Sequence, residues 1–187
     1  MTMELYKSID VLLKSKESVV VAIEGGSAGG KTTLAKELEE KYRGTVLHMD
    51  DFFLRPEQRT SKRLAEVGGN VDRERFYDEV VIPLVNREKI SYRRFDCSTF
   101  SVLPTVEIEP GKLTVVEGVY STHPYLGKYY DLAVFLDIDS NLQKERILIR
   151  NGQEKALRFF EEWIPMEQRY FESMKVKEKC DLVLHII

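Results

Sequence analysis

The fold is decided by the stretch VVVAIEGGSAGGKTTLAKEL, residues 19–38. A run of Val, Ala and Ile gives way to glycines, and a lysine, two threonines and a helix-forming segment follow. Gly25, Gly30, Lys31 and Thr32 stand at the spacing of the P-loop pattern Gly-x-x-x-x-Gly-Lys-Thr. The pattern falls between an expected strand and an expected helix, which is the context that this motif requires. The sequence therefore predicts a phosphate-binding loop.

The chemistry of this loop follows from its residue types. Glycines let backbone N–H groups turn toward a ligand, because no Cβ blocks its approach. The helix that begins near Lys31 adds unpaired N–H groups and the positive end of its dipole. Lys31 can reach the β- and γ-phosphates of a nucleotide, and Thr32 offers a hydroxyl to Mg²⁺. The predicted nucleotide-binding residues are Gly25, Gly26, Ser27, Ala28, Gly29, Gly30, Lys31, Thr32 and Thr33.

Short apolar runs and helical patterns alternate along the chain, which predicts an α/β fold with a parallel sheet covered on both faces. We expect a P-loop NTPase three-layer sandwich, as one kinase-sized domain over 1–187, with a β-hairpin insertion at about 88–110 and a helical lid at about 146–160. Pro165 should kink or restart the last long helix. The expected strands are 18–24, 44–49, 112–118, 131–138 and 181–187, and the expected helices are 31–42, 72–85, 140–150 and 154–177.

Acidic residues follow three of the expected strands. Ligands of parallel α/β sheets bind at the carboxyl ends of the strands. Asp50 and Glu117 lie there, and they could place Mg²⁺ together with Thr32 and activate a hydroxyl. Asp51 is either a loop cap or a support behind Asp50, and both readings stay open. For Asp137 and Asp139 we favour a helix N-cap before the segment SNLQKERI.

Composition and missing motifs narrow the class of protein. The net charge of −3 and the pI of about 5.8 give no general attraction to nucleic acid or to an anionic membrane. The guanine-reading pattern Asn-Lys-x-Asp is absent, and 187 residues are too few for a motor ATPase, so a small kinase remains. We expect a cytoplasmic protein with two reduced cysteines, no membrane span, and a homo-oligomer as an open possibility. The arginine-rich stretch 55–94 is either exposed surface or a positive rim for an anionic ligand.

Several blocks, in order along the chain, resemble the uridine kinase-like group of P-loop kinases, which includes uridine/cytidine, nicotinamide riboside and pantothenate kinases and phosphoribulokinases. The blocks are GGSAGGKTTLA, HMDDFF, VDRERFYDEVVIPL, VVEGVYS, YDLAVFLDID and KERILIRNG. The resemblance implies ATP as donor and Mg²⁺ as metal. It further implies that Asp50 is the base and helps to place the metal, that Lys31 holds the transferred phosphate, and that Glu117 lies near Mg²⁺. In the same way it assigns the acceptor to Asp72 and Tyr92 and the lid to Arg146 and Arg150, with Arg158 left open.

The implied activity is phosphorylation of a small-molecule hydroxyl. By resemblance the leading acceptor is a nucleoside such as uridine; the alternatives are a nicotinamide riboside- or pantothenate-type kinase, or a nucleotide-binding regulatory protein without kinase activity. The stretch YRRFDCSTF lacks the histidine that reads a pyrimidine in uridine kinases, so the acceptor stays open. If Arg93 and Arg94 face the site, the acceptor would carry a phosphate. We expect His48 and His185 to be packed inside their strands.

Overall fold

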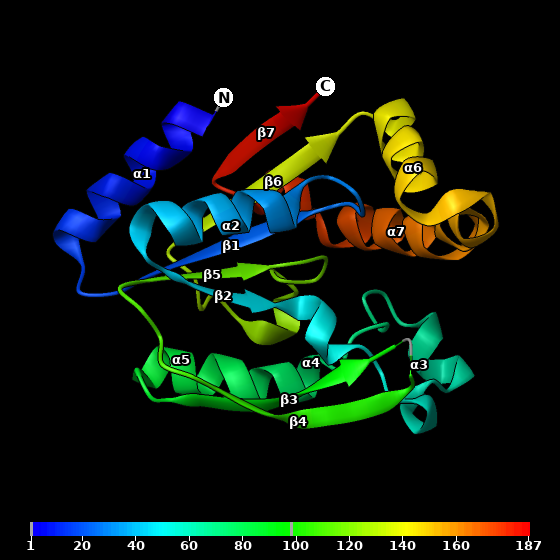
Figure 1. Cartoon of the computed structure of the whole chain (residues 1–187), viewed down its shortest axis with the longest axis horizontal. Helices are drawn as coiled ribbons and strands as arrows, with labels where there is room; N and C mark the ends of the chain where they lie inside the picture. The colour runs from blue at the N-terminus through cyan, green and yellow to red at the C-terminus, as the bar shows by residue number, and fades with distance from the viewer. Residues whose placement is uncertain (1, 98) are drawn as a thin grey trace.

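Five parallel strands form the central sheet of the computed structural model, which describes residues 2–97 and 99–187. Their spatial order is β2–β5–β1–β6–β7. The middle strand pairs with both neighbours, Val21 standing opposite Val115 on one side and Leu132 on the other. All carboxyl ends point to the side of the molecule where α3 and α6 lie (Figure 1). The strands are β1 Val19–Gly25, β2 Thr45–His48, β5 Leu113–Glu117, β6 Leu132–Ile138 and β7 Leu182–Ile186.

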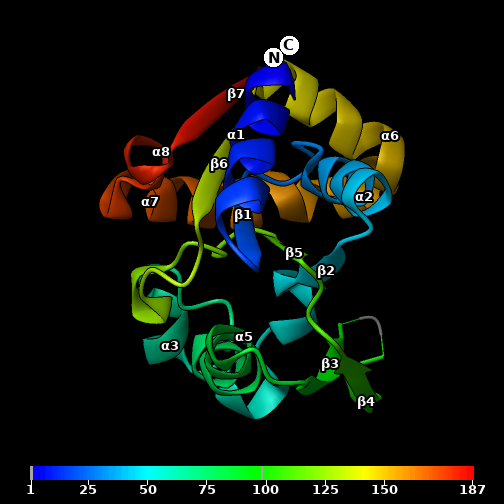
Figure 2. The same cartoon turned by 90° about the vertical axis from the view of Figure 1, so that its left-hand side faces the viewer.

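The sheet is the middle of three layers. Every residue of β1 is buried, as expected of a strand covered on both faces. One face packs against α1 (Thr2–Ser15) and α2 (Lys31–Tyr42) through residues such as Leu5 and Leu38. The other face packs against α7 and the segment around α4 and α5. In Figure 2 the strands lie between α2 and the pair α7 and α8. The predicted α/β sandwich with a five-stranded parallel sheet is confirmed.

Two prolines explain irregular turns in the long helical segments. Proline lacks the N–H of the helical ladder and its ring clashes with the carbonyl four residues earlier, so the preceding turn widens. A π-helical turn precedes Pro83 and another precedes Pro165. The predicted break at Pro165 is therefore confirmed. The segments are α4 Arg73–Phe76, η3 Tyr77–Val81, α5 Ile82–Asn86, α6 Ser140–Arg158, η5 Phe159–Trp163, α7 Ile164–Met174 and α8 Val176–Lys179.

The remaining elements surround the carboxyl ends of the strands. β3 (Ile90–Asp96) and β4 (Ser101–Ile108) form a separate antiparallel pair, which lies beside the helical segment of α4 and α5 (Figures 1 and 2). Short turns follow β2 and β5: η1 Met49–Phe52, η2 Pro56–Gln58, α3 Ser61–Ala65 and η4 Pro124–Leu126. Within the described ranges no helix is long and apolar enough to cross a membrane.

Candidate functional site

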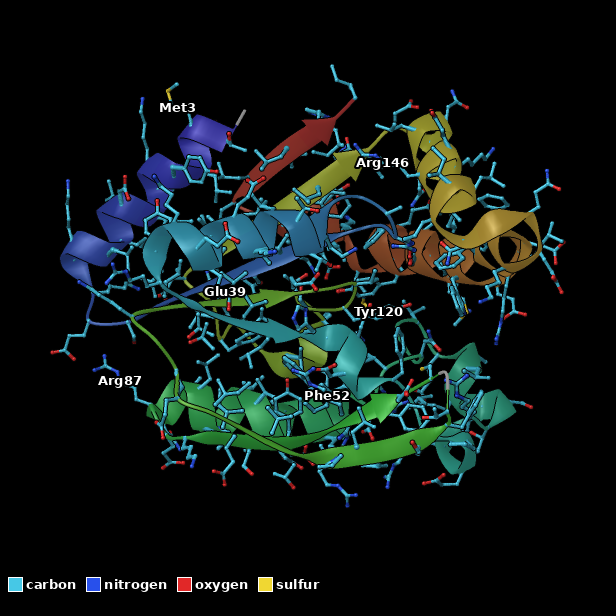
Figure 3. The ribbon with its side chains drawn as sticks, viewed as in Figure 1. Met3, Glu39, Phe52, Arg87, Tyr120 and Arg146 are labelled. Atoms are coloured by element: carbon cyan, nitrogen blue, oxygen red, sulfur yellow. The ribbon has the colours of Figure 1, made fainter. Side chains whose placement is uncertain are left out.

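A cavity of about 750 Å³ lies where the strands end. The P-loop forms one wall, the turn η1 after β2 contributes Asp50, and the last residue of β5 contributes Glu117. Arg146 of α6 and Tyr120, which follows β5, also line this end of the sheet (Figure 3). The cavity thus brings together the predicted phosphate loop, the two carboxylates and the first lid arginine.

The P-loop backbone is shaped to hold an anion. Gly25 has φ +135°, and a Cβ there would lie 2.5 Å from the carbonyl oxygen of Leu136. Gly30 has φ 94° and precedes α2, whose N-terminus has no side-chain cap. The first amides of α2 are therefore available to a ligand, and the helix dipole favours a negative one. A phosphate chain fits this cradle.

Lys31 bridges the loop from the start of α2. Its Nζ donates hydrogen bonds to the carbonyl oxygens of Gly25 (2.8 Å) and Gly26 (2.9 Å). These bonds hold the ammonium group over the residues that should surround the phosphates. The predicted role of Lys31 therefore agrees with its position.

Two side chains from the lid side hold the P-loop, and the sequence analysis missed both. Glu167 of α7 accepts hydrogen bonds from the backbone N–H (2.9 Å) and the hydroxyl of Ser27. Gln143 of α6 donates to the carbonyl oxygen of Ser27 at 2.8 Å. Burial raises the pKa of Glu167, with the bonds from Ser27 opposing that rise. No local pattern marks either residue, because their partner is more than 100 positions away.

Thr32, Glu117 and Asp50 form the part of the site that suits a metal. The hydroxyl of Thr32 donates to Oε1 of Glu117 at 3.2 Å. Asp50 lies on the cavity wall with its side chain open to the cavity, and the protein around it raises its pKa by desolvation while Lys31 opposes the rise. In the described part of the chain no three acidic, His or Cys side chains gather as a metal site. Thr32 and two carboxylates fit Mg²⁺ that takes its other ligands from phosphates and water.

The two strand histidines are not packed as expected, so that prediction is wrong. His48 at the end of β2 is partly exposed, and its Nδ1 lies 2.6 Å from Oε1 of Glu117. This hydrogen bond raises the pKa of His48. His185 is exposed and pairs with Asp137 at 3.0 Å. Edge positions and strand ends leave side chains open even in a buried sheet.

Tyr92 and Asp51 pair with one another behind the cavity wall. The Tyr92 hydroxyl donates to Oδ2 of Asp51 at 2.8 Å, and the Tyr92 ring is 2% exposed against Phe52. Arg94 lies 3.2 Å from the same oxygen, and Arg93 donates to a backbone carbonyl of β4. The described residues that line the cavity include none of these four: Asp51, Tyr92, Arg93 and Arg94. Asp51 therefore supports the loop that carries Asp50, and the arginine pair does not face the site.

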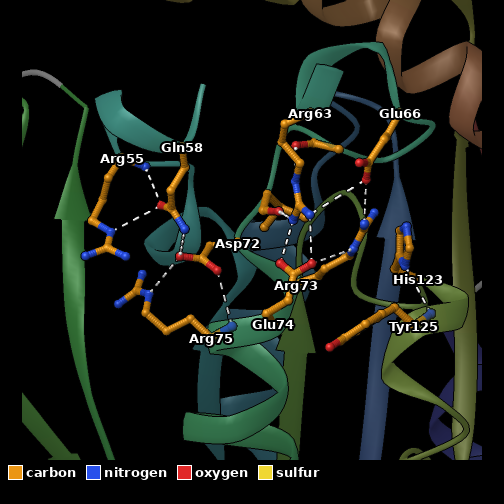
Figure 4. A network of polar contacts seen from close by, with 12 residues as sticks. Arg55, Gln58, Arg63, Glu66, Asp72, Arg73, Glu74, Arg75, His123 and Tyr125 are labelled. Atoms are coloured by element: carbon orange, nitrogen blue, oxygen red, sulfur yellow. Dashed lines mark hydrogen bonds and ion pairs between the residues drawn. The ribbon is translucent and has the colours of Figure 1, made fainter. Parts of the chain in front are cut away.

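The side chain of Asp72 is hydrogen-bonded to residues around the start of α4 (Figure 4). It is 3% exposed and caps α4 by accepting from the backbone N–H of Arg75 at 3.2 Å. Gln58 donates to its other oxygen at 2.7 Å. The cavity wall nearby is formed by Asn70 and Val71. Asp72 thus directly follows a lining residue but does not itself line the cavity in which the resemblance would use it.

The lid arginines occupy different places along the cavity. Arg146 donates to the carbonyl oxygen of Ala28 in the P-loop at 3.3 Å. Arg150 stacks on Phe159 and Arg158 on Trp163, at 5.4 and 5.2 Å from the ring centroids. All three arginines line the cavity. Of these three arginines, Arg146 therefore contacts the P-loop, whereas Arg150 and Arg158 stack on aromatic rings.

Glu24 is a buried carboxylate that joins three parts of the site. It lies in β1 next to the P-loop and is 0% exposed. It accepts hydrogen bonds from backbone N–H groups of Gly25, Tyr120 and Thr122, and from the hydroxyls of Thr122 and Tyr170, at 3.0–3.2 Å. Tyr120, which lines the cavity, has φ 77°, a conformation that costs energy for a bulky residue. Glu24 thereby fixes this strained turn. A lone acid at the end of an apolar run was its only signal in the sequence.

The pH dependence of stability should report Glu24. Burial raises its pKa to about 7 despite the bonds that it accepts. Between about pH 4.5 and 7 the folded state then binds more protons than the unfolded state, so stability falls as pH rises through that window. Between these limits the free energy of unfolding of the unchanged protein should fall by about 3 kcal/mol, and Glu24→Gln should abolish this fall. Urea unfolding at several pH values measures the difference between the two proteins, and parallel pH profiles would contradict the prediction.

Taken together, the parallel sheet, the P-loop and the facing carboxylates define a nucleotide-binding protein of the P-loop kinase class. The sequence profile of the Phosphoribulokinase / Uridine kinase family matches residues 20–157, and the chain belongs to this family. The resemblance given above is thus confirmed.

Relatives and solved structures agree with this assignment. A uridine kinase of Anoxybacillus flavithermus is 25% identical over 175 residues, covering 86% of this chain and 83% of that protein. A structure described as a possible uridine kinase from Bacillus stearothermophilus is 23% identical with a TM-score of 0.70, covering 97% of this chain and all of that one. A putative fructose transport system kinase from Silicibacter is 19% identical with a TM-score of 0.74, covering 98% and 99%. At these identities the structures establish the fold alone.

Proposed function

We propose that this protein is an ATP-dependent kinase that transfers the γ-phosphoryl group to a hydroxyl of a small metabolite. One observation carries the proposal: Lys31 and Thr32 at the uncapped start of α2 share a single cavity with Asp50 and Glu117. A pure nucleotide binder needs Lys31, Thr32 and one carboxylate for Mg²⁺, but it does not need a further carboxylate that can act as a base. The family assignment supports the same activity.

Each residue has a role that its position suits. The P-loop amides and Lys31 hold the donor phosphates, and Thr32 and Glu117 hold Mg²⁺, which supplies charge neutralisation when bound. Asp50 orients the acceptor hydroxyl and takes its proton. Arg146 stabilises charge on the transferred group and excludes water as the lid closes. Glu167 and Gln143 keep the P-loop in place for these contacts.

The acceptor is the open part of the proposal. Uridine is the first candidate, because the relative from Anoxybacillus flavithermus is a uridine kinase. The family fold also occurs in structures named for other acceptors, so it does not fix the choice. Nicotinamide riboside and pantothenate remain alternatives, and Asp72 and Tyr92 as acceptor contacts would require the loop after β2 to rearrange.

An ADP-release assay with a panel of nucleosides, vitamins and sugars tests the proposal. We expect acceptor-dependent ADP formation with Mg²⁺ and ATP for at least one member of the panel. Tight ATP binding without ADP formation on any acceptor would instead favour a regulatory nucleotide-binding protein. The Mg²⁺-free reaction is the control for metal dependence.

Nucleotide binding should be visible through Trp163, the single tryptophan of the chain. It lines the cavity beside Phe159 and Arg158. We expect ATP with Mg²⁺ to change its fluorescence, because lid closure alters both contacts. Adenosine is the matched control, since it lacks the phosphates that the P-loop holds. Equal responses to ATP and adenosine would show that the P-loop is not the main binding element.

A further inference from the structure

One part of the cavity wall comes from the loop after β2 and from Cys97 and Phe100 beside β3 and β4. The rings of Phe53 and Phe100 form its apolar surface, and Arg59, Asn70 and Cys97 contribute polar atoms. Phe100 has φ 52°, so its ring is presented by strained backbone. Strain of this kind persists where the surrounding structure holds it, and it gathers at binding sites. This part of the cavity wall is therefore built to receive a ligand.

Arg59 is held in place on this wall. Its Nε donates to the carbonyl oxygen of Leu54 at 3.0 Å, and its guanidinium lies 5.9 Å from the Phe100 ring centroid. One N–H is thereby used and another bonds to the sulfur of Cys97, whereas a guanidinium has five N–H donors. The group is fixed at the cavity edge with donors to spare.

The neighbouring arginines differ from Arg59 in their partners. Five of them lie within 4.0 Å of a carboxylate: Arg55, Arg63, Arg73, Arg75 and Arg94. Three of these pairs, those of Arg63, Arg73 and Arg75, belong to the network in Figure 4. Within residues 2–97 and 99–187, no carboxylate lies within ion-pair distance of Arg59, which is the member of this group on the cavity wall. A planar cation in a partly enclosed site lacks its counterion.

We propose that the acceptor carries an anionic group, a carboxylate or a phosphate, which Arg59 binds on this part of the cavity wall. This inference rests on the proposed function, because the molecule that carries the anion is the alcohol whose hydroxyl reaches Asp50. A guanidinium binds either anion through two parallel hydrogen bonds. The aromatic lining suits a flat or apolar body between hydroxyl and anion.

Within the arginine-rich stretch 55–94, Arg59 is therefore the arginine that is available to an anion in the cavity. The sequence alone pointed to Arg93 and Arg94 for a phosphorylated acceptor. Arg94 is neutralised by Asp51, and Arg93 donates to a hairpin carbonyl. In the tertiary structure the arginine that could bind an anionic acceptor is instead Arg59, which follows the short turn η2 and lines the cavity.

Alkylation of Cys97 tests anion binding without any turnover. Cys97 is exposed and lines the same part of the cavity wall, whereas Cys180 lies in a separate small pocket and reports general reactivity. With Mg²⁺ and a non-hydrolysable ATP analogue filling the P-loop, we expect benzoate and phenyl phosphate to slow maleimide labelling of Cys97. Benzyl alcohol, the neutral match, should leave the rate unchanged. Mass spectrometry of the two cysteine peptides gives both rates, and comparison of the two anions separates carboxylate from phosphate.

Variants of Arg59 and Arg55 make the test specific. Arg59→Gln should weaken protection by the anions about 10-fold or more, the worth of a charge-assisted hydrogen bond. Arg55→Gln is the matched control, because Arg55 pairs with Glu57 outside the cavity lining and should keep protection unchanged. Unchanged labelling of Cys180 checks that the variants fold. Equal protection by benzyl alcohol, no protection by either anion, or full protection in Arg59→Gln would overturn the proposal.

Matched acceptors then connect the anion site to activity. Nicotinic acid riboside and nicotinamide riboside differ only in the charge of one group, as do pantothenate and pantothenol. In the pair that supports the faster turnover, we expect the anionic member to have the higher kcat/KM. Arg59→Gln should raise the KM for that anionic acceptor about 10-fold with little change in kcat. A preference for both neutral members would overturn the anion assignment while leaving the kinase activity established. Anion protection of Cys97 without turnover of any alcohol would instead remove the proposed function and leave an anion-binding cavity.

Discussion

Asp50→Asn is expected to lower kcat by about 10²- to 10⁴-fold, the usual contribution of a general base. The amide keeps the size and position of the carboxylate but cannot take the proton of the acceptor hydroxyl. Asp50 lines the same cavity as Lys31, and desolvation raises its pKa, which makes it a stronger base than an aspartate in water. Steady-state rates with the best acceptor from the ADP-release panel measure the loss.

The same variant should retain nucleotide binding. The P-loop and Lys31 contact the phosphates independently of Asp50, so the ATP dissociation constant measured through Trp163 should change by no more than a few-fold. Asp51→Asn is the matched control, because Asp51 is bonded to Tyr92 and Arg94 behind the wall. If Asp51→Asn lowered kcat as much as Asp50→Asn, the base would not be Asp50, and full activity of Asp50→Asn would exclude it directly.

Arg146→Ala should lower kcat by about 10³-fold or more, as removal of an arginine that stabilises a transferring phosphoryl group does in related reactions. Its guanidinium donates to Ala28 in the P-loop, and a Cβ at Gly30 would lie 4.0 Å from its Nη1. The charge is thus already beside the cradle before the lid closes. Single-turnover measurements with saturating ATP separate this loss from weaker binding.

Arg150→Ala is the control for Arg146→Ala. Arg150 stands four residues further along α6, and its guanidinium stacks on Phe159 and bonds to Asn151. We expect Arg150→Ala to raise the KM for ATP more than it lowers kcat, because Arg150 contacts Phe159 and Asn151 and not the P-loop. Reversal of this order, with Arg150 the more damaging, would assign the phosphate contact to Arg150.

The local sequence determined the fold and the donor half of the site. Residues 18–24 and the glycines after them predict a strand, a phosphate loop and a helix, because burial on both faces and positive φ demand particular residue types at particular positions. The helix starts at Lys31 as expected, and Asp139 caps α6 through the N–H groups of Asn141 and Leu142. These features depend on neighbours within a few residues, so they can be read from the chain itself.

Only the tertiary structure decided which distant side chains share the cavity. Glu167 reaches Ser27 across 140 positions, and Glu24 holds Tyr120 across 96. The arginine-rich stretch gives Arg59 and Arg94 the same appearance, yet one lines the cavity and the other is neutralised by Asp51. The physical reason is that packing of separate elements, and not residue type, determines whether a charge finds a partner inside the protein or remains available to a ligand.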